Sequence, residues 1–508
     1  MDRGVKGTAR WCALLGTGLL LASCSVGPNY KQPTAPVSAT FKELPAGTAA
    51  EASAFRPARP QDDALRGTWW EIFGDAQLDA LEEQVSVSNQ TLAQAEAQFR
   101  GARAAVLAAR AGLFPTVTAS AGVTRSHSSA NRGTVIVPGS GTGAGTGSTG
   151  AVTAGGDTTV YQVPIDFSYE FDLWGRVRRQ IEAEVATAQA SAADVENVRL
   201  SLQAELAVDY FQLRGLDQQK QLLDSVVAAY GKALQLTVNR HDQGVVSGVD
   251  VAQAETQLDT TRAQATDLGA ARAGFEHAIA MLTGKPPAEL AIPPAPVAVQ
   301  PPAIPVALPS ELLERRPDIA AAERRVAAAN AQIGVAQAAF YPSLTLSASG
   351  GFQSSTLGKL FSLPSRFWSI GPALAETLFS GGRRRAATAQ AEAAYDAAVA
   401  GYRESVLVAF QNVEDNLATL RILAQESTEQ AAAVAAAEHA LELARNRYQG
   451  GITAYLEVIT AENAALANER AAVDLQIRRM TAAVNLVKAL GGGWSASALP
   501  AGAALGAR

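Results

Sequence analysis

The sequence predicts an internally duplicated α+β membrane protein in which long helices alternate with pairs of amphipathic strands. Three observations lead to this fold class. A signature at residues 239–255 returns at residues 446–462, offset by 207 residues, with Asn, Arg, Gly, Val, Ala and Glu in register. Apolar residues recur at spacings of three and four over stretches longer than ordinary helices. Between these stretches, apolar and polar residues alternate as in strands with one apolar face. The constant offset indicates a duplicated structural unit.

The first 23 residues have the pattern of an export signal, and Cys24 is predicted to be the lipid-modified first residue of the mature chain. Basic residues precede an apolar segment, residues 11–22, which is shorter than the ~20 residues that a transmembrane helix needs. The segment ends in Leu-Ala-Ser-Cys, which resembles a bacterial lipoprotein processing box. The alternative is an ordinary signal peptide with an incidental cysteine. Residues 24–66, rich in Pro, Ala and polar residues, are predicted to form a lipidated N-terminal tether.

The charge and cysteine content exclude several classes of function. Without residues 1–23 the chain keeps 39 Lys and Arg against 47 Asp and Glu, a net charge of about −8. No nucleic-acid partner is expected, because nucleic-acid binding requires a basic face. The mature chain has one cysteine, so neither an intramolecular disulfide nor a cysteine-based metal site is expected. No later apolar stretch is long enough to predict a transmembrane helix.

Each repeat is predicted to contain two strands with one apolar and one polar face. The boundaries are 67–285 for the first repeat, with strands at about 115–125 and 160–171, and 310–492 for the second, with strands at about 342–352 and 366–378. Aromatic residues are expected to face lipid or to form an interfacial belt: Tyr161, Phe167, Tyr169, Phe171, Phe367 and Trp368. Arginines at 176, 178, 179 and 383–385 follow the strands and are expected either to meet lipid phosphates or to form a solvated cluster.

Each pair of strands is followed by a long helix and a return helix. The first long helix is predicted from Arg176 to the turn at Gly244, about 68 residues or ~100 Å. The second reaches the turn at Gly451. A Pro-rich linker, residues 286–309, joins the repeats, and residues 493–508 are expected to form a flexible tail.

Four strands per chain predict an oligomer. The smallest outer-membrane barrels have about eight strands, so one chain cannot close a barrel. Open strand edges are excluded from lipid because their backbone groups would remain unpaired. A trimer supplies twelve strands and a ring wide enough for a lumen, whereas the eight strands of a dimer would be filled by side chains.

Several separate motifs, in order, resemble the TolC-type outer-membrane channel proteins, specifically their OprM-like or NodT lipoprotein branch. The resemblance covers nearly the whole mature chain. The motifs are residues 24–30 (Cys-Ser-Val-Gly-Pro-Asn-Tyr), 69–75 (Trp-Trp-Glu-Ile-Phe-Gly-Asp), 169–176 (Tyr-Glu-Phe-Asp-Leu-Trp-Gly-Arg), 316–323 (Arg-Pro-Asp-Ile-Ala-Ala-Ala-Glu), 333–336 (Ile-Gly-Val-Ala) and 340–343 (Phe-Tyr-Pro-Ser). One departure is residues 378–383 (Leu-Phe-Ser-Gly-Gly-Arg), where the family more often has Phe-Asp before Gly-Arg.

The resemblance implies a homotrimer with a twelve-stranded β-barrel in the outer membrane, continued by a long α-helical barrel in the periplasm. Such a protein is a lipid-anchored, passive exit duct of a tripartite efflux pump for drugs or other toxic small molecules. The implied partners are a periplasmic adaptor (membrane-fusion protein), an inner-membrane transporter of the RND type, and outer-membrane lipid. Two alternatives remain: the outer component of a type I protein secretion system and, from a different class, a periplasmic coiled-coil adaptor lipoprotein. An adaptor would need no lipid-facing aromatic strands.

The turns between the long and return helices carry the candidate functional residues. The predicted adaptor-docking tips are Gly244, Val245, Val246, Ser247, Gly451, Ile452, Thr453 and Ala454. The alternative role of these turns is only to end one helix and start the next. The resemblance places a periplasmic gate at the second tip, with Tyr448, Ile452, Leu456, Glu457 and Thr460. Three copies of Glu457 around a narrow pore would attract cations; alternatively Leu456 packs in the helix seam and Glu457 lies on a solvated face.

The residue inventory points away from an enzyme. The histidines at 127, 241, 277 and 439 are scattered, without an HExxH motif or a triad-like grouping. The Gly-rich tract at 139–156 lacks the Gly-Lys-Ser/Thr of a phosphate-binding loop. We therefore expect no catalytic site, no cofactor and no metal site.

Overall fold

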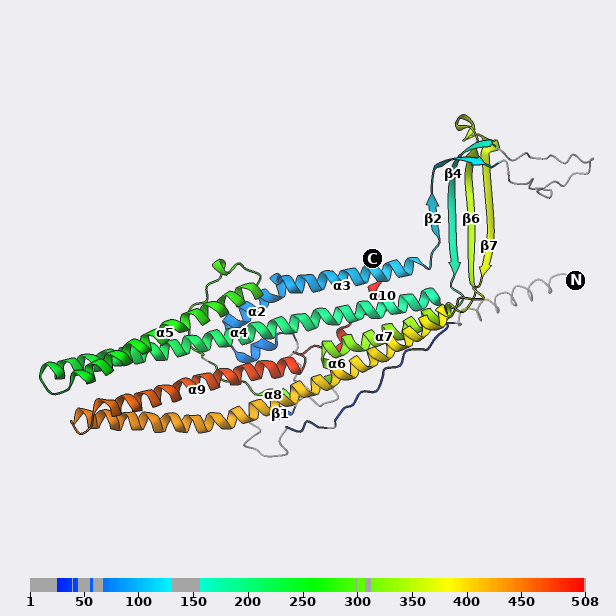
Figure 1. Cartoon of the computed structure of the whole chain (residues 1–508). Coiled ribbons are helices and arrows are strands. Elements are labelled where there is room, and N and C mark those ends of the chain that lie inside the picture. Colours follow the sequence, from blue (N-terminus) through cyan, green and yellow to red (C-terminus); the bar gives the residue numbers. More distant parts are fainter. Residues whose placement is uncertain are drawn as a thin grey trace, which may run out of the picture. The chain divides into compact units, whose positions relative to one another are not determined.

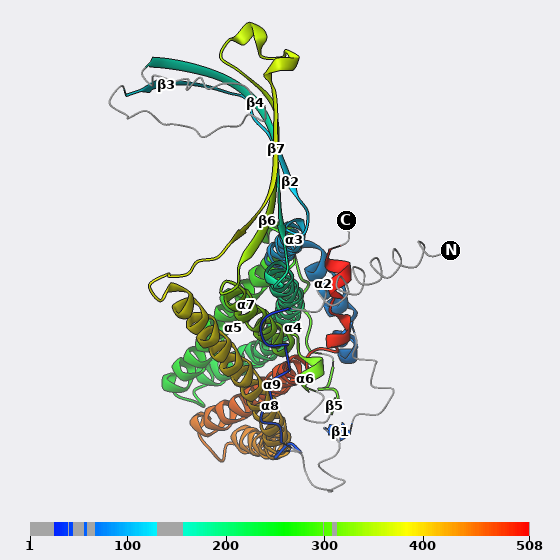
Figure 2. The ribbon, with the colours of Figure 1, turned by 90° about the vertical axis from the view of Figure 1, so that its right-hand side faces the viewer.

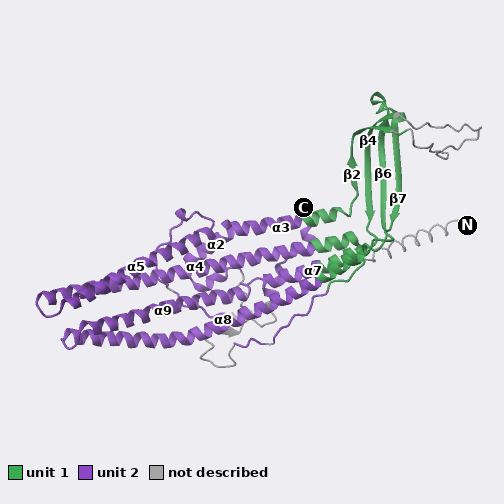
Figure 3. Ribbon diagram, viewed as in Figure 1, with its two compact units in different colours: residues 1–30, 105–184, 329–394 green, residues 31–104, 185–328, 395–508 purple. Residues whose placement is uncertain are grey.

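The computed structural model describes residues 25–38, 40–43, 55–57, 67–129, 156–297, 299–306 and 312–506. The predicted export signal, Cys24 and about half of the predicted tether lie outside these residues. The chain divides into two compact units (Figure 3), which are considered one at a time. Unit 1 comprises residues 1–30, 105–184 and 329–394, and unit 2 comprises residues 31–104, 185–328 and 395–508. Each unit therefore draws on both halves of the sequence.

The long helices and the return helices, labelled in Figure 1, recur with one constant offset. The long helices α4 (Arg176–Asp242) and α8 (Arg383–Gln449) each have 67 residues. The return helices α5 (Gly248–Leu282) and α9 (Tyr455–Ala489) each have 35 residues. Every boundary of the first pair recurs 207 residues later in the second. Both long helices continue without a break to the tip turn, and each begins a few residues after the end of a strand, β4 (Gly156–Phe171) or β7 (Arg366–Ala375).

The shorter helices follow the same duplication with a different offset. Helices α3 (Gln90–Ala111) and α7 (Pro317–Ala338) each have 22 residues and begin 227 residues apart. The additional 20 residues lie between α3 and α4, in the first strand hairpin. The remaining elements are the helices α2 (Ala76–Ser88), α6 (Leu312–Arg315) and α10 (Gly502–Leu505), the 3-10 helices η3 (Trp69–Phe73), η4 (Pro287–Glu289), η6 (Leu357–Lys359), η7 (Leu363–Ser365) and η8 (Ala496–Ala498), and the parallel strands β1 (Phe55–Pro57) and β5 (Ile304–Val306).

The sheet of unit 1 is antiparallel with the order β2-β4-β6-β7 (Figure 1). Its strands are β2 (Thr116–Ala119), β3 (Gly122–Ser128), β4 (Gly156–Phe171), β6 (Ser343–Ser354) and β7 (Arg366–Ala375). Strands β2 and β3 pair with successive parts of β4, so the chain follows four strand paths. The sequence predicted one strand where β2 and β3 are separate. The interruption lies opposite Pro164, which has no backbone N–H to pair, although its carbonyl still accepts from the Ser120 N–H at 3.1 Å.

The register gives this sheet one apolar face and one polar face. Residues paired across antiparallel strands project to the same side. The apolar face carries Val117, Val123, Tyr161, Val163, Ile165, Phe167, Tyr169, Phe171, Leu344, Leu346, Phe352, Trp368, Ile370 and Leu374. The polar face carries Thr116, Thr118, Gln162, Asp166, Ser168, Glu170, Thr345, Ser347, Ser349 and Ser369. The prediction that Phe367 joins the lipid-facing aromatics is wrong, because Phe367 pairs with Gly351 and so shares the face of Asp166 and Ser369.

The core of unit 2 joins helices from both repeats. Trp69, Trp70 and Phe73 of η3 are buried, and Trp69 packs edge-on against each of the other two rings. Phe73 also meets Phe211 of α4, with ring centroids 5.1 Å apart. The same cluster includes Leu282, Val413 and Leu486, from α5, α8 and α9 respectively. The Trp-Trp-Glu-Ile-Phe-Gly-Asp motif therefore supplies aromatic side chains to the shared core.

Gly284 and Gly491 end the two return helices at equivalent junctions of unit 2. Both have a left-handed backbone, with φ of 72° and 94°. A Cβ on Gly284 would lie 2.3 Å from the Ser88 carbonyl oxygen, and one on Gly491 would lie 2.0 Å from the Arg315 carbonyl oxygen. A neighbouring side chain binds the last turn of each helix: Asn89 Nδ2 donates to the Leu282 oxygen at 2.8 Å, and Arg316 Nη1 donates to the Ala489 oxygen at 2.8 Å. The end of α5 thus abuts the junction between α2 and α3, and the end of α9 abuts the junction between α6 and α7.

Gly491→Ala is expected to destabilise unit 2. The left-handed conformation alone costs a non-glycine residue about 1–3 kcal/mol, and the clash with the Arg315 carbonyl adds to this cost. Gly231→Ala is the matched control, because Gly231 lies inside α4 with open space around its Cα and Ala favours a helix by about 1 kcal/mol. Thermal unfolding followed by circular dichroism should show a lowered midpoint for the first variant only. An unchanged midpoint for Gly491→Ala would contradict the junction.

Candidate functional site

The two tip turns of unit 2 share one backbone geometry. Gly244 and Gly451 are left-handed, with φ of 73° and 72°. The residue after each glycine donates its N–H to a carbonyl in the last helical turn: Val245 to Arg240 at 2.8 Å, and Ile452 to Arg447 at 2.9 Å. These bonds satisfy carbonyl groups that a helix end leaves free. The first seven residues of the repeated signature therefore encode the same turn twice.

The tips differ in how the return helix begins. Ser247 forms a capping box with Asp250: its hydroxyl accepts from the Asp250 N–H, and the Asp250 carboxylate accepts from the Ser247 N–H at 3.0 Å. The corresponding residue before α9 is Ala454, which has no side-chain cap. An N-cap of this kind contributes about 0.5–2 kcal/mol. The return helix of the second tip therefore begins without the side-chain cap that the first one has.

The predicted gate residues fall into exposed and buried groups. Ile452 and Leu456 are 73% and 57% exposed, although both side chains are large and apolar. Glu457 and Thr460 are also exposed, and the Thr460 hydroxyl donates to the Leu456 carbonyl at 2.9 Å. Tyr448 is only 8% exposed. The structure thus places four of the five predicted residues on the surface.

Tyr448, the fifth predicted gate residue, packs between the two hairpins. Its ring lies 5.2 Å from that of Tyr455. The Arg240 guanidinium, from the first hairpin, lies over the Tyr448 ring at 4.9 Å. Arg240 also donates to the Tyr448 carbonyl at 3.4 Å. A large planar side chain with a cation above it is better suited to packing than to lining water, so Tyr448 joins the first tip to the second.

Glu457 forms an ion pair that the sequence-based prediction missed. Arg447 Nη1 lies 3.2 Å from Glu457 Oε1, and the Thr453 hydroxyl donates to the other carboxylate oxygen. Arg447 belongs to the repeated Asn-Arg pair, whose first copy is Arg240. Arg447 is visible in the sequence as part of the repeat, but the tip turn at Gly451 brings it beside Glu457. The charge at this tip is therefore that of a partly exposed pair and not that of a lone carboxylate.

A buried polar cluster lies next to the second tip and was also missed. Glu462 is buried in α9 and accepts a bond from Arg445 Nη2 at 3.1 Å. Burial raises the pKa of Glu462, and Arg445 opposes this shift. Its counterpart in the first repeat, Glu255, is exposed. On the neighbouring α4, the Tyr230 hydroxyl accepts from Gln257 Nε2 at 3.3 Å. The repeat thus gives the same residue type two different environments.

The N-terminal segment is bound to unit 1 through Arg179 of α4. Arg179 donates to the carbonyl oxygens of Val26 and Gly27, both at 3.2 Å, and to Asn29 Oδ1 at 3.0 Å. A Cβ on Gly27 would lie 2.5 Å from the Cα of Gly334, so this motif glycine permits close approach to α7. Arg179 is buried and therefore does not belong to the predicted cluster of lipid-facing or solvated arginines. The predicted lipidation site Cys24, outside the described residues, directly precedes this segment.

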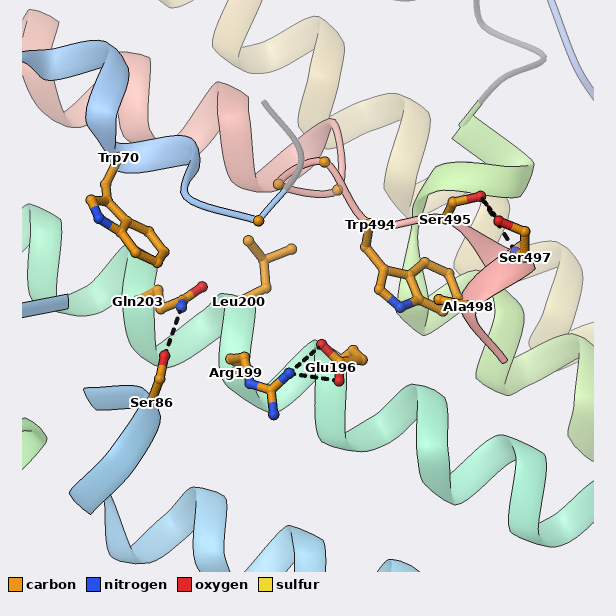
Figure 4. Close-up of a pocket in the computed structure, with 14 residues that line it drawn as sticks. Trp70, Ser86, Glu196, Arg199, Leu200, Gln203, Trp494, Ser495, Ser497 and Ala498 are labelled. Atoms are coloured by element: carbon orange, nitrogen blue, oxygen red, sulfur yellow. Dashed lines mark hydrogen bonds and ion pairs between the residues drawn. The ribbon is translucent and has the colours of Figure 1, made fainter. Parts of the chain in front are cut away.

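A pocket of about 510 Å³ lies in unit 2 between η3, α4 and the segment after α9 (Figure 4). Trp70 and Trp494 contribute to its lining. Its polar groups bond mainly to one another: Arg199 donates to both Glu196 oxygens at 2.7 and 2.8 Å, and Gln203 Nε2 donates to the Ser86 hydroxyl at 3.3 Å. This arrangement contains no nucleophile paired with a base.

Two kinds of feature are absent from the part of the chain that the structure describes. Among those residues, no group of three or more His, Cys, Asp or Glu side chains could hold a metal ion. None of the described helices is long and apolar enough to cross a membrane.

Comparison with known proteins identifies the family. A family model described as outer membrane efflux protein matches residues 81–285 and 308–492. The outer membrane protein OprJ of Pseudomonas aeruginosa is 33% identical over 484 residues, which cover 94% of each chain. The toluene efflux pump outer membrane protein TtgF of Pseudomonas putida is 32% identical over 481 residues, covering 94% of this chain and 96% of its own.

A solved outer-membrane channel structure has a similar fold. The solved structure of the outer-membrane channel OprN matches with a TM-score of 0.80 and 32% identity, covering 93% of this chain and 100% of that chain. The predicted outer-membrane location and efflux role are thereby confirmed at the level of the family. The chain belongs to the outer membrane efflux protein family.

Proposed function

We propose that three copies of the chain form a lipid-anchored, passive duct through the outer membrane that performs no chemistry. The observation that supports this most directly is the sheet of unit 1. Its strands have one apolar and one polar face, as lipid-facing and lumen-facing strands require. Among the described strands, β7 pairs only with β6, and β2 and β3 pair only with β4. Both edges therefore need partners, and neighbouring copies can supply them.

The proposed duct is the exit of a tripartite efflux pump for small toxic compounds. Relatives named as toluene or antibiotic efflux pump outer membrane proteins support this class of cargo. The helices continue the duct over ~100 Å, since 67 residues rise 1.5 Å each. Both tips, residues 244–247 and 451–454, are proposed to bind the hairpins of a periplasmic adaptor, which joins the duct to an inner-membrane transporter of the RND type. Exposed Val245 and Ile452 supply apolar contact area for such binding.

The second tip is the proposed gate. Ile452 and Leu456 are exposed in the chain, so three copies can bring them together as an apolar constriction. Glu457 and Arg447 add a ring of ion pairs at the same level. The start of α9 lacks a side-chain cap at Ala454, so the bonds of Glu457 to Thr453 and Arg447 are the local side-chain contacts that hold this turn. The first tip, with its capping box, serves as the fixed frame.

The ion pair gives opposite expectations for its two partners. Glu457→Gln leaves Arg447 unpaired, so the permeability ratio of cations to anions should fall severalfold. Arg447→Gln leaves Glu457 unpaired, so the same ratio should rise severalfold. Single-channel recordings of purified protein in planar bilayers, with a salt gradient across the membrane, measure this ratio directly.

The matched control is Asp259→Asn, which changes the net charge as Glu457→Gln does but lies on the exposed surface of α5. It should leave the ratio unchanged. If the Glu457 and Arg447 variants both keep the wild-type permeability ratio, the gate does not lie at the second tip. Absence of any conductance in the wild type would contradict the duct itself.

A further inference from the structure

The loop between β6 and β7, residues 355–365, contains the 3-10 turns η6 and η7 (Figure 2). It also carries exposed apolar side chains. Leu357, Phe361 and Leu363 are between 64% and 83% exposed. The hydroxyls of Ser362 and Ser365 both donate to the Lys359 carbonyl at 2.7 Å, which ties the two 3-10 turns of the loop together. Such an exposed apolar patch on a bonded loop indicates contact with an apolar partner.

The loop continues the apolar face of the sheet. The ring of Phe361 lies 5.6 Å from that of Phe352, edge to face. Phe352 is on the apolar face and pairs with Arg366 at the start of β7. The loop therefore packs on the side of Trp368 and Ile370, and not on the polar side. Whatever contacts the apolar face of the hairpin also contacts the loop.

Strand length places the loop at a membrane boundary, given the proposed function. Strand β7 has 10 residues, and a tilted strand needs about 9–11 residues to cross the hydrocarbon layer. Arg366 is its first residue, so it lies at one boundary of that layer. The β6–β7 loop lies at this boundary. The other end of β7, from which the chain continues to α8, lies at the opposite boundary. Under the proposed orientation the loop faces the outer leaflet.

The charges of the hairpin select an anionic lipid. Residues 343–375 contain two charged side chains, Lys359 and Arg366, and no carboxylate. Both are exposed, and neither forms an ion pair with another residue that the structure describes. Two cations beside three exposed apolar side chains complement a phosphate group attached to acyl chains.

We propose that the β6–β7 loop binds a phosphorylated, multiply acylated lipid of the outer leaflet. Lys359 and Arg366 contact its phosphates, and Leu357, Phe361 and Leu363 contact its acyl chains. This proposal rests on the proposed function, because it takes the apolar face to be the lipid face. The lipid binds at the surface of each copy and leaves the lumen and the tips unaffected.

The test uses the full-length protein in detergent with bisphosphorylated, hexa-acylated lipid A as the probe and phosphatidylethanolamine as the neutral comparison. Native mass spectrometry counts the lipid bound at each concentration. Wild-type protein should retain lipid A, and the double variant Lys359→Glu/Arg366→Glu should require at least a tenfold higher concentration. Lys232→Glu/Arg262→Glu, with the same change of charge on helices of unit 2, should bind as the wild type does.

Equal binding of lipid A by the wild type and the Lys359→Glu/Arg366→Glu variant would overturn the proposal, as would equal retention of phosphatidylethanolamine. A Phe361→Ser variant whose oligomer weakens without added lipid would also overturn it, because a neighbouring copy would then cover the loop. Single-channel conductance separates this proposal from the duct. The Lys359→Glu/Arg366→Glu variant should conduct as the wild type does. A non-conducting wild type would contradict the proposed duct but not the lipid site.

Discussion

Ile370→Arg is expected to abolish assembly of the protein in the outer membrane. Ile370 lies in the middle of β7, exposed on the apolar face and in register with Ala348. An arginine at the membrane midplane of a β-barrel costs about 2–4 kcal/mol. Three copies impose this cost three times on one barrel.

Ser369→Arg is the matched control for Ile370→Arg. Ser369 is the preceding residue of β7 and pairs with Ser349 on the polar face, so its side chain would enter the lumen. Membrane fractionation and the heat-dependent migration of the oligomer on gels report assembly. The Ser369 variant should fractionate with the outer membrane, and the Ile370 variant should not. Normal assembly of both would show that the apolar face does not meet lipid.

Asp217→Ala is expected to cause the largest loss of stability within unit 2. The Asp217 side chain is only 2% exposed and lies 2.6 Å from Arg272 and 3.3 Å from Arg214. It also accepts from the Ala295 N–H at 3.1 Å, and Arg214 donates to the Pro293 carbonyl at 2.7 Å. The network thus binds the Pro-rich linker to α4 and α5. Removing the carboxylate leaves the Arg214 and Arg272 guanidinium groups without this partner. The free energy of unfolding should fall by about 3–5 kcal/mol.

Denaturant unfolding and limited proteolysis of the linker would measure the effect of Asp217→Ala. Asp224→Ala is the control, since Asp224 is on the same helix but is half exposed and paired only with Lys220 at the surface. Such a surface pair contributes about 0–1 kcal/mol. Equal losses from the two variants would contradict the role of the buried network.

The helices could be predicted closely because their signals are local and are present twice. The residues that end the long helices, Gly244 and Gly451, are 207 positions apart, and each supplies the left-handed turn. The strands were found from their alternation of apolar and polar residues. Their faces were harder to assign, since a shift of one residue reverses every side chain of a strand. Phe367 was misplaced for this reason, and pairing with Gly351 settles its side.

The details of the tips could not be predicted because they depend on contacts between distant segments. Nothing local to Tyr448 indicates that Arg240, from the other repeat, covers its ring. The pairing of Arg447 with Glu457 needs the turn between them. Likewise, the Asn89 amide and the Arg316 guanidinium bind the last turn of a return helix at equivalent junctions. Because the residue types differ, comparing the two repeats by sequence does not show that these residues are equivalent.

The central claim is that three chains close their sheets into one ring by joining β7 of each copy to β2 and β3 of the next. Disulfide cross-linking tests it directly, with Thr118→Cys on β2 combined in turn with Ser369→Cys, Gly371→Cys and Ala373→Cys on the same face of β7. After oxidation in intact membranes, at least one pair should give a ladder on denaturing gels that ends at three chains and collapses on reduction. Uncross-linked chains from every pair, or a ladder that ends at two chains or continues beyond three, would contradict the closed trimer.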